Sequence, residues 1–217
     1  MIVHHLLKNN SVLNTFIQEI RAIKVQDDSM RFRRNIERIG EVLAYELSKE
    51  LSYSQEKITT VLGIKESQIP QKDLVICSIL RAGLPLHQGI MNYFDAAENA
   101  FISAYRFHPN NDADFEIKVE YFASPSLGGK TLILADPMLA TGQSLVSVYE
   151  AIKKYGTPKK IHIACVIAAE EGIDFIKNHF PENTELWIAD VDPILNDKGY
   201  IVPGLGDAGD LSFGAKL

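Results

Sequence analysis

The sequence lacks several features that would place it in a broad class of protein. Among its 217 residues, no apolar run reaches the roughly 18 residues that a membrane-spanning helix needs. The start, MIVHHLLKNNS, has no basic stretch followed by an apolar one, so no signal peptide is expected. The formal charge of −6 disfavours general affinity for nucleic acid, although it allows one local anion pocket. We therefore expect neither a membrane nor a nucleic-acid partner.

Cysteine is also scarce. The 2 cysteines, Cys77 and Cys165, both lie inside apolar runs. Buried, reduced thiols in a cytoplasmic protein are the simplest interpretation. No spacing of cysteine and histidine resembles a zinc site, and no repeat, low-complexity tract or linker divides the chain. These absences predict a single domain over residues 1–217 without a metal site built from protein ligands alone.

The N-terminal part, over about residues 1–52, has the pattern of a helical arm. One apolar stripe recurs every three or four positions and consists of Phe32, Ile36, Ile39, Leu43 and Leu47. Asp28 or Ser29 can cap the start of this helix. A shorter stripe earlier in the chain consists of Val12, Phe16 and Ile20.

From Leu74 onward, short apolar runs alternate with helical segments. The runs are LVICSIL, AFISAYR, TLILA, IHIACVIAA and ELWIA, and helices are predicted over 85–94, 144–155 and 173–178. Continuous apolar runs alternating with helices predict an α/β fold with a central, mainly parallel sheet flanked by helices. Ligands of such sheets collect at the carboxyl ends of the strands. Two segments follow such ends, RAGL after the first run and DPMLATGQS after the third.

The segment DPMLATGQS has the composition of a site for a phosphate beside a sugar. The backbone N–H groups of a tight loop and of the following helix turn form an anion cradle. Thr141 and Ser144 add hydroxyl donors, and Gly142 lets the chain pass close to a phosphate. Asp136 suits a sugar diol, a magnesium ion or a developing positive charge. An ordinary loop with a solvated aspartate and capping hydroxyls is the alternative interpretation.

Two other segments have less regular patterns. Residues 107–126 are polar and aromatic without a clear period, which favours a hairpin or a mobile flap over the site. The stretch GYIVPGLGDAGDLSFG has five glycines and one proline, which predicts neither a helix nor a central strand.

Several motifs together resemble the uracil phosphoribosyltransferases, a branch of the type I phosphoribosyltransferase family. ILRAGL, YR, DPMLATG and GYIVPGLGDAGD occur in that family's order and at its spacing, and RFRRNIERIGEVLAYE and VHHLLK resemble its N-terminal part. The resemblance covers essentially the whole chain. It implies the type I fold, with N-terminal helices and a C-terminal base-binding hood at about 199–214.

The resemblance also implies a set of site residues. Arg81 and Arg106 would meet the diphosphate of phosphoribosyl diphosphate (PRPP), and Asp207 would also touch this donor. The ribose and its 5′-phosphate would be held by Asp136, Pro137, Met138, Leu139, Ala140, Thr141, Gly142, Gln143 and Ser144. Uracil would be lined by Ile201, Gly206, Asp207 and Ala208. Residue chemistry alone leaves alternatives open: a surface ion pair for Arg81, a cap of its own glycine turn for Asp207 and plain core for Ile201.

The sequence departs from the family pattern at several positions. Gln143 replaces a second glycine of the loop, and Ser78 replaces a proline before ILRAGL. Ser124 and Leu211 each stand where a cation is expected. Two missing cations near a diphosphate would weaken donor binding or change regulation, and they leave room for a divergent relative.

The implied reaction is uracil plus PRPP giving UMP and diphosphate, with Mg²⁺ bound together with PRPP and a homodimer or larger homo-oligomer as the assembly. Asp136, Asp207 and Arg81 would be catalytic. His87, His108, His162 and His179 are interpreted as structural or surface residues. The alternatives are a transferase for another base and a nucleotide-sensing regulator without turnover.

Overall fold

The structure, a computed structural model, describes residues 1–107 and 116–216, with 104–107 and 116–120 described by backbone alone. Its central sheet follows the order β1-β10-β9-β7-β4-β5-β6. These strands are β1 (Ile2–His5), β4 (Leu74–Leu80), β5 (Glu98–Phe107), β6 (Glu116–Ala123), β7 (Thr131–Ala135), β9 (Lys160–Ala169) and β10 (Glu185–Asp192). Every neighbouring pair is parallel except β5 with β6, so the prediction of a mainly parallel sheet is confirmed.

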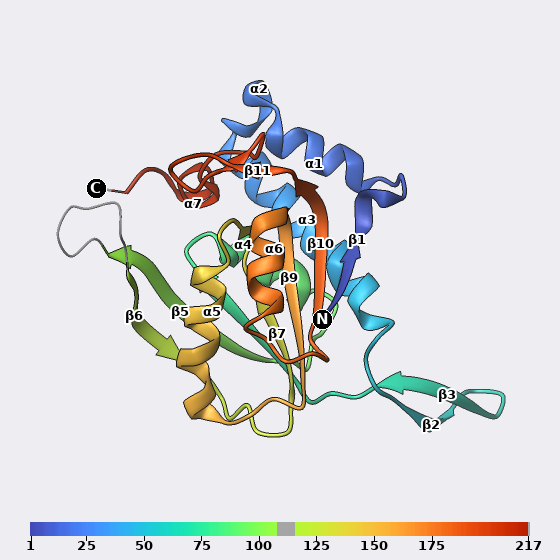
Figure 1. The fold of residues 1–217 in the computed structure, drawn as a ribbon. Helices are drawn as coiled ribbons and strands as arrows, with labels where there is room; N and C mark the ends of the chain where they lie inside the picture. Colours follow the sequence, from blue (N-terminus) through green and yellow to red (C-terminus); the bar gives the residue numbers. More distant parts are fainter. Residues whose placement is uncertain (108–115, 217) are drawn as a thin grey trace.

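Helices cover both faces of this sheet (Figure 1). One face packs against α1 (Leu13–Arg21), α3 (Ser29–Ser48) and α4 (Gly83–Met91), and the other against α5 (Gln143–Ile152) and α6 (Glu170–Lys177). Leu74 and Ile76 of β4 join the first core, whereas Val75 and Cys77 join the second. This period of two explains why both faces of the strand are apolar, with Ser78 as its one polar residue.

Several local predictions are confirmed. The run TLILA forms β7 with the expected bounds, and Asp28 caps α3 by accepting a hydrogen bond from the Arg31 N–H. Cys77 and Cys165 are fully buried free thiols, and burial raises the pKa of the Cys77 thiol to about 12. A separate observation is that none of the described helices is long and apolar enough to cross a membrane.

Four features differ from the sequence-based predictions. The helical arm begins with a strand, β1, which pairs with β10 at the edge of the sheet. The first helix buries Leu13, Ile17 and Ile20, whereas Val12 is 63% exposed. Residues 53–70, to which no element was assigned, form an antiparallel hairpin of β2 (Tyr53–Thr59) and β3 (Ile64–Pro70). The glycine-rich C-terminal stretch contains a short helix, α7 (Ala208–Phe213), because the Asp207 carboxylate caps its first turn.

The expected flap over residues 107–126 lies only partly within the described chain. Its second half contains β6, which pairs antiparallel with β5, so the two strands form the sides of a hairpin at the sheet edge. Residues 108–115 lie outside the described part.

The remaining elements of the described chain are short. They are η1 (Leu6–Lys8), α2 (Ile23–Gln26), β8 (Met138–Leu139), η2 (Lys153–Tyr155), β11 (Ile194–Leu195) and β12 (Ile201–Val202).

Candidate active site

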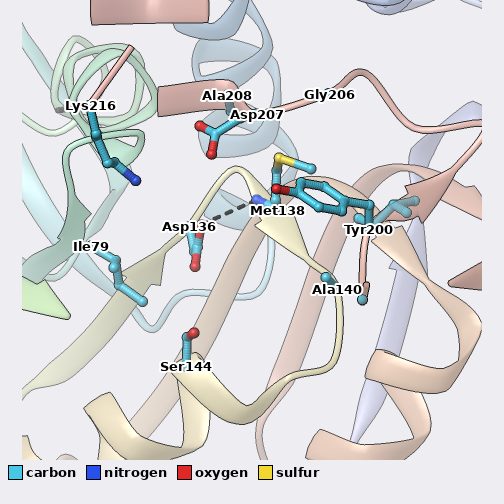
Figure 2. A pocket seen from close by; sticks show the side chains of 12 residues that line it. Ile79, Asp136, Met138, Ala140, Ser144, Tyr200, Gly206, Asp207, Ala208 and Lys216 are labelled. Carbon is cyan, nitrogen blue, oxygen red and sulfur yellow. Dashed lines mark hydrogen bonds between the residues drawn. The ribbon is translucent and has the colours of Figure 1, made fainter. Parts of the chain in front are cut away.

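A pocket of about 430 Å³ opens at the carboxyl edge of the sheet (Figure 2). The chain runs from β4 outward to β5 and β6, and then returns to place β7 on the other side of β4. This reversal is the topological switch point at which open α/β sheets bind ligands. Asp136 follows β7 and Ile79 belongs to β4, and both line the pocket.

The pocket brings together two segments that the sequence analysis singled out separately. From the loop after β7 come Asp136, Met138, Ala140 and Ser144, and from the C-terminal hood come Ile201, Gly206, Asp207 and Ala208. The pocket is also lined by Ile79, Gly199, Tyr200 and Lys216. The loop and the hood therefore form one site although about 60 residues of chain separate them.

The loop after β7 forms a small recess beside the main pocket. Its lining comprises Asp136, Met138, Leu139, Ala140, Thr141, Gly142, Ser144 and Leu145. Gly142 has φ +81°, a left-handed conformation that glycine adopts without strain, and it is the N-cap of α5. The recess therefore lies at the start of a helix, where N–H groups without partners in the helix favour an anion.

Glycines also set how closely α6 approaches this loop. A Cβ atom on Gly142 would lie 2.8 Å from Cγ2 of Ile176 and 2.9 Å from Cδ1 of Phe175. A Cβ atom on Gly172 of α6 would lie 2.0 Å from the Ala140 carbonyl oxygen. Gly142 therefore meets a packing requirement in addition to the close phosphate approach expected from the sequence.

The rest of the loop is fastened to β9. The Pro137 carbonyl accepts hydrogen bonds from the N–H groups of Val166 and Ile167, both at 3.0 Å. Met138 and Leu139 form β8, which pairs with β9. Pro137 lines neither the pocket nor the recess, and the exposed Gln143 lies outside both linings, so these two residues shape the loop from outside.

Asp136 lies at the tip of β7, half-buried in the wall of the pocket. Its N–H donates to the Ala164 carbonyl at 3.1 Å, and its Oδ1 accepts from the Met138 N–H at 3.2 Å. Burial raises the pKa of Asp136 to about 7, although the Met138 hydrogen bond works in the opposite direction. A half-protonated carboxyl at neutral pH would ionise fully beside a positive charge.

The N-terminal helices hold the hood in place. Arg21 at the end of α1 donates to Asp190 and Asp192, both at 2.8 Å, and to the Gly204 carbonyl at 2.9 Å. Gly204 has φ +60°, and a Cβ atom there would lie 2.1 Å from the Ile201 carbonyl oxygen. Sequence reasoning missed Arg21, because it reads as an ordinary polar residue at a helix end.

The alternatives left open for Arg81 and Asp207 are both seen. Arg81 Nη2 pairs with Asp210 Oδ1 at 3.1 Å and donates to the Gly214 carbonyl at 3.1 Å. Asp207 Oδ1 accepts from the Asp210 N–H at 2.9 Å while its carboxylate also lines the pocket. Arg81 is not among the pocket-lining residues, and the Arg106 side chain lies outside the described part.

The departure at Ser78 has a structural explanation. Ser78 Oγ lies 2.7 Å from His87 Nδ1, and His87 Nε2 lies 2.9 Å from Asn99 Oδ1. Because an amide oxygen only accepts, His87 donates from Nε2 and accepts from the Ser78 hydroxyl. Burial lowers the pKa of His87, which agrees with a neutral, structural imidazole.

Among the described residues, His162, His179, Leu211 and Ser124 are all outside the pocket lining. His162 accepts a hydrogen bond from the Trp187 indole, and His179 bonds the Phe175 carbonyl. His108 lies outside the described part. Leu211 packs against the core, and the Ser124 hydroxyl donates to the Pro125 carbonyl.

Comparisons with known proteins bear on the family and the fold of the chain. A family model described as uracil phosphoribosyltransferase matches residues 7–215. A protein named uracil phosphoribosyltransferase from Porphyromonas gingivalis is 51% identical over 217 residues, which is 100% of both chains. One of the same name from Pyrococcus furiosus is 43% identical over 190 residues, covering 86% of this chain and 80% of the relative. The solved AQ2163 protein from Aquifex aeolicus is similar with a TM-score of 0.87 at 30% identity, covering 100% of each chain.

Proposed function

The chain belongs to the uracil phosphoribosyltransferase family, and from this premise we propose that it transfers the phosphoribosyl group of PRPP to N1 of uracil. The products are UMP and diphosphate, as in pyrimidine salvage. One observation carries the proposal. An anion-binding recess at the start of a helix, a carboxyl group and the glycine-rich hood meet in one pocket at the topological switch point of the sheet. In this proposal residues 1–217 act as one phosphoribosyltransferase domain.

Each part of the pocket has a distinct task in this reaction. The loop amides from Ala140 to Ser144 hold the 5′-phosphate and so fix the ribose. The bond from C1′ to the diphosphate breaks early, and the Asp136 carboxylate favours the positive charge that develops on the ribose. Asp207 touches the donor from the hood, and Arg81 and Arg106 favour the leaving diphosphate.

The hood reads the base mainly through its backbone. Ile201, Gly206 and Ala208 line the pocket, and in this proposal their peptide N–H and C=O groups contact the base, while Arg21 fixes the turn that carries them. The described histidines named above lie outside the pocket lining, so orientation and electrostatics supply most of the rate. The uracil N1 proton is assigned to no side chain.

Magnesium fits this pocket as an ion carried by the donor. Among the described residues no group of three or more His, Cys, Asp or Glu side chains could hold a metal alone. The lining instead offers the oxygens of Asp136, Asp207 and Ser144, and Mg²⁺ is usually bound by one or two carboxylates plus substrate phosphates. When bound, the ion neutralises the charge of the diphosphate.

We expect excess chelator to abolish turnover and added Mg²⁺ to restore it. Full activity in chelator would contradict this assignment.

The β2–β3 hairpin supports a homodimer or larger homo-oligomer. It projects from the body (Figure 1), and Val61 and Leu62 at its tip are 101% and 98% exposed. Apolar side chains that their own chain does not cover favour contact with a second copy. Light scattering should give a mass greater than that of one chain, and the mass should be lower for a Leu62→Asp variant.

The reduced, buried thiols support a cytoplasmic location.

A steady-state assay tests the activity directly. Labelled PRPP is supplied with uracil, cytosine, hypoxanthine or adenine, and the nucleotide product is identified. We expect UMP from uracil. Efficient conversion of another base would identify a different transferase, and UMP binding without turnover with any base would identify a nucleotide-sensing regulator.

A further inference from the structure

Lys216 is a positively charged residue that lines the pocket. It follows the hood segment, about residues 199–214, that the sequence motifs indicated. It lines the same pocket as Asp136 and Asp207. Figure 2 shows its amine pointing into the space between these two carboxyl groups and Ile79. Among the described residues that line this pocket, Lys216 is the one cation.

The tail that carries Lys216 is anchored close to the pocket. Arg81 Nη2 donates to the Gly214 carbonyl at 3.1 Å, two residues before Lys216. A chain advances at most about 3.6 Å per residue, so this bond keeps the Lys216 backbone near the end of β4. The same guanidinium is paired with Asp210 at 3.1 Å, so its charge is already partly balanced.

A cation in the pocket would complement its two carboxyl groups. Asp136 and Asp207 both present carboxyl groups to the pocket, and a diphosphate entering beside them meets like charge. Neither Leu211, which packs against the core, nor Ser124, which bonds its neighbour, supplies a positive charge. Lys216 is therefore placed to offset this repulsion.

We propose that Lys216 binds the diphosphate group of PRPP, its ammonium donating hydrogen bonds to the diphosphate oxygens. The inference rests on the proposed function, since it assumes that PRPP is the donor. Figure 2 shows Lys216 and Ile79 on one side of Asp136 and Ala140 of the phosphate loop on the other. The lysine thus faces the leaving group, while the loop takes the 5′-phosphate.

Two variants and a control test this role. In Lys216→Met we expect the KM for PRPP to rise about 10-fold or more, because a charge-assisted hydrogen bond is lost, with a smaller effect on the KM for uracil. Lys216→Arg keeps the charge and should restore most of the affinity. Lys177→Met is the matched control, because Lys177 lies on α6 in an exposed pair with Asp174 and should leave both constants unchanged.

Binding measurements separate this inference from the proposed function. Calorimetric titration with magnesium diphosphate should show about 10-fold weaker binding to Lys216→Met, with a shallower salt dependence, whereas binding of ribose 5-phosphate should be unchanged. If wild-type protein forms no nucleotide but diphosphate binding still depends on Lys216, the proposed function fails and this assignment stands. If wild-type protein forms UMP and Lys216→Met changes neither KM nor diphosphate affinity, the assignment is overturned. Selective loss of ribose 5-phosphate binding would also overturn it, because the lysine would then contact the other phosphate.

Discussion

Asp136 combines a cost to stability with a role in the reaction. The pKa of Asp136 is about 7 in the folded protein, against an ordinary value of 3.8. The carboxyl group therefore holds its proton more tightly when the protein is folded. Its contribution to stability is therefore greatest below pH 3.8 and is lost as the pH rises to about 7. The charged form that the reaction uses is the form that the fold disfavours.

The variant Asp136→Asn separates these two effects. We expect kcat to fall at least about 100-fold, because the amide does not favour the cationic ribose. At pH 8 the variant should be more stable by about 1–2 kcal/mol, a value reduced for screening by pocket water. Urea unfolding and steady-state kinetics on the same preparation measure both quantities. A variant that fails to fold would show a structural acid, and near-normal turnover would remove Asp136 from the reaction.

The pH profile gives a second measurement on the same residue. In wild-type protein, kcat/KM for PRPP should rise with pH through about 7 and then level off, because the carboxylate is the active form. Asp136→Asn should lack this inflection. An unchanged inflection in the variant would assign the titration to another group.

Gln143 is the loop residue at which the sequence departs from the family pattern that its motifs resemble. Its side chain is exposed, and it lies outside both the pocket and the recess linings. If the loop binds phosphate through backbone amides, Gln143→Gly should change the KM for PRPP less than about 10-fold. A loss of more than about 100-fold would make the glutamine side chain a ligand, and Lys177→Met again serves as a surface control.

At the scale of elements, α6 acts as a support for the phosphate loop. A Cβ atom on Gly172 would lie 2.0 Å from the Ala140 carbonyl oxygen. Any larger side chain must therefore push the loop and the helix apart. We expect Gly172→Ala to raise the KM for PRPP by about 10-fold or more and to lower stability by about 1–3 kcal/mol. Gly63, at the hairpin tip, has no atom within 4 Å of its Cβ position, so Gly63→Ala is a control without this clash. Unchanged donor affinity in Gly172→Ala would mean that the loop is positioned without α6.

Elements were predictable where the local pattern and the tertiary environment agree. β7 is apolar throughout and ends at Asp136, so its bounds follow from the sequence alone. β1 has only four residues, two of them histidines, and it becomes a strand because β10 offers an edge to pair with. Ile2 pairs with Glu185, which is far away in the chain, so this pairing leaves no local signal.

The short helix α7 is a second element that the local sequence pattern does not predict. Its glycines argue against a helix, yet the Asp207 cap and the ion pair between Arg81 and Asp210 hold it in place. The sequence suggested a surface ion pair for Arg81, without a partner, and a turn cap for Asp207 as alternatives to roles in the site. It could not indicate that the cap and the pocket-lining carboxylate are the same group.

At the scale of the whole molecule, the site is assembled from both ends of the chain. The loop and the hood were predicted from their own residue types. Arg21 comes from the first helix and Lys216 from the tail, and each reaches the site only through the fold. Neither residue belongs to a motif, so sequence reasoning had no pattern by which to find it.

Base selection is the property that depends on this whole assembly, because Arg21 fixes the hood against β10 while the loop fixes the ribose. Uracil presents acceptor, donor and acceptor along O2, N3–H and O4, and peptide groups of the hood can supply the complement. Cytosine replaces O4 with an amino donor and lacks the N3 proton, so buried peptide groups would stay unsatisfied. We expect discrimination of roughly 10⁴-fold against cytosine, while a fluorine at position 5, off the hydrogen-bonding edge, should be tolerated. Competition of uracil, 5-fluorouracil and cytosine for one labelled donor measures this ratio, and comparable conversion of cytosine and uracil would refute recognition by the backbone.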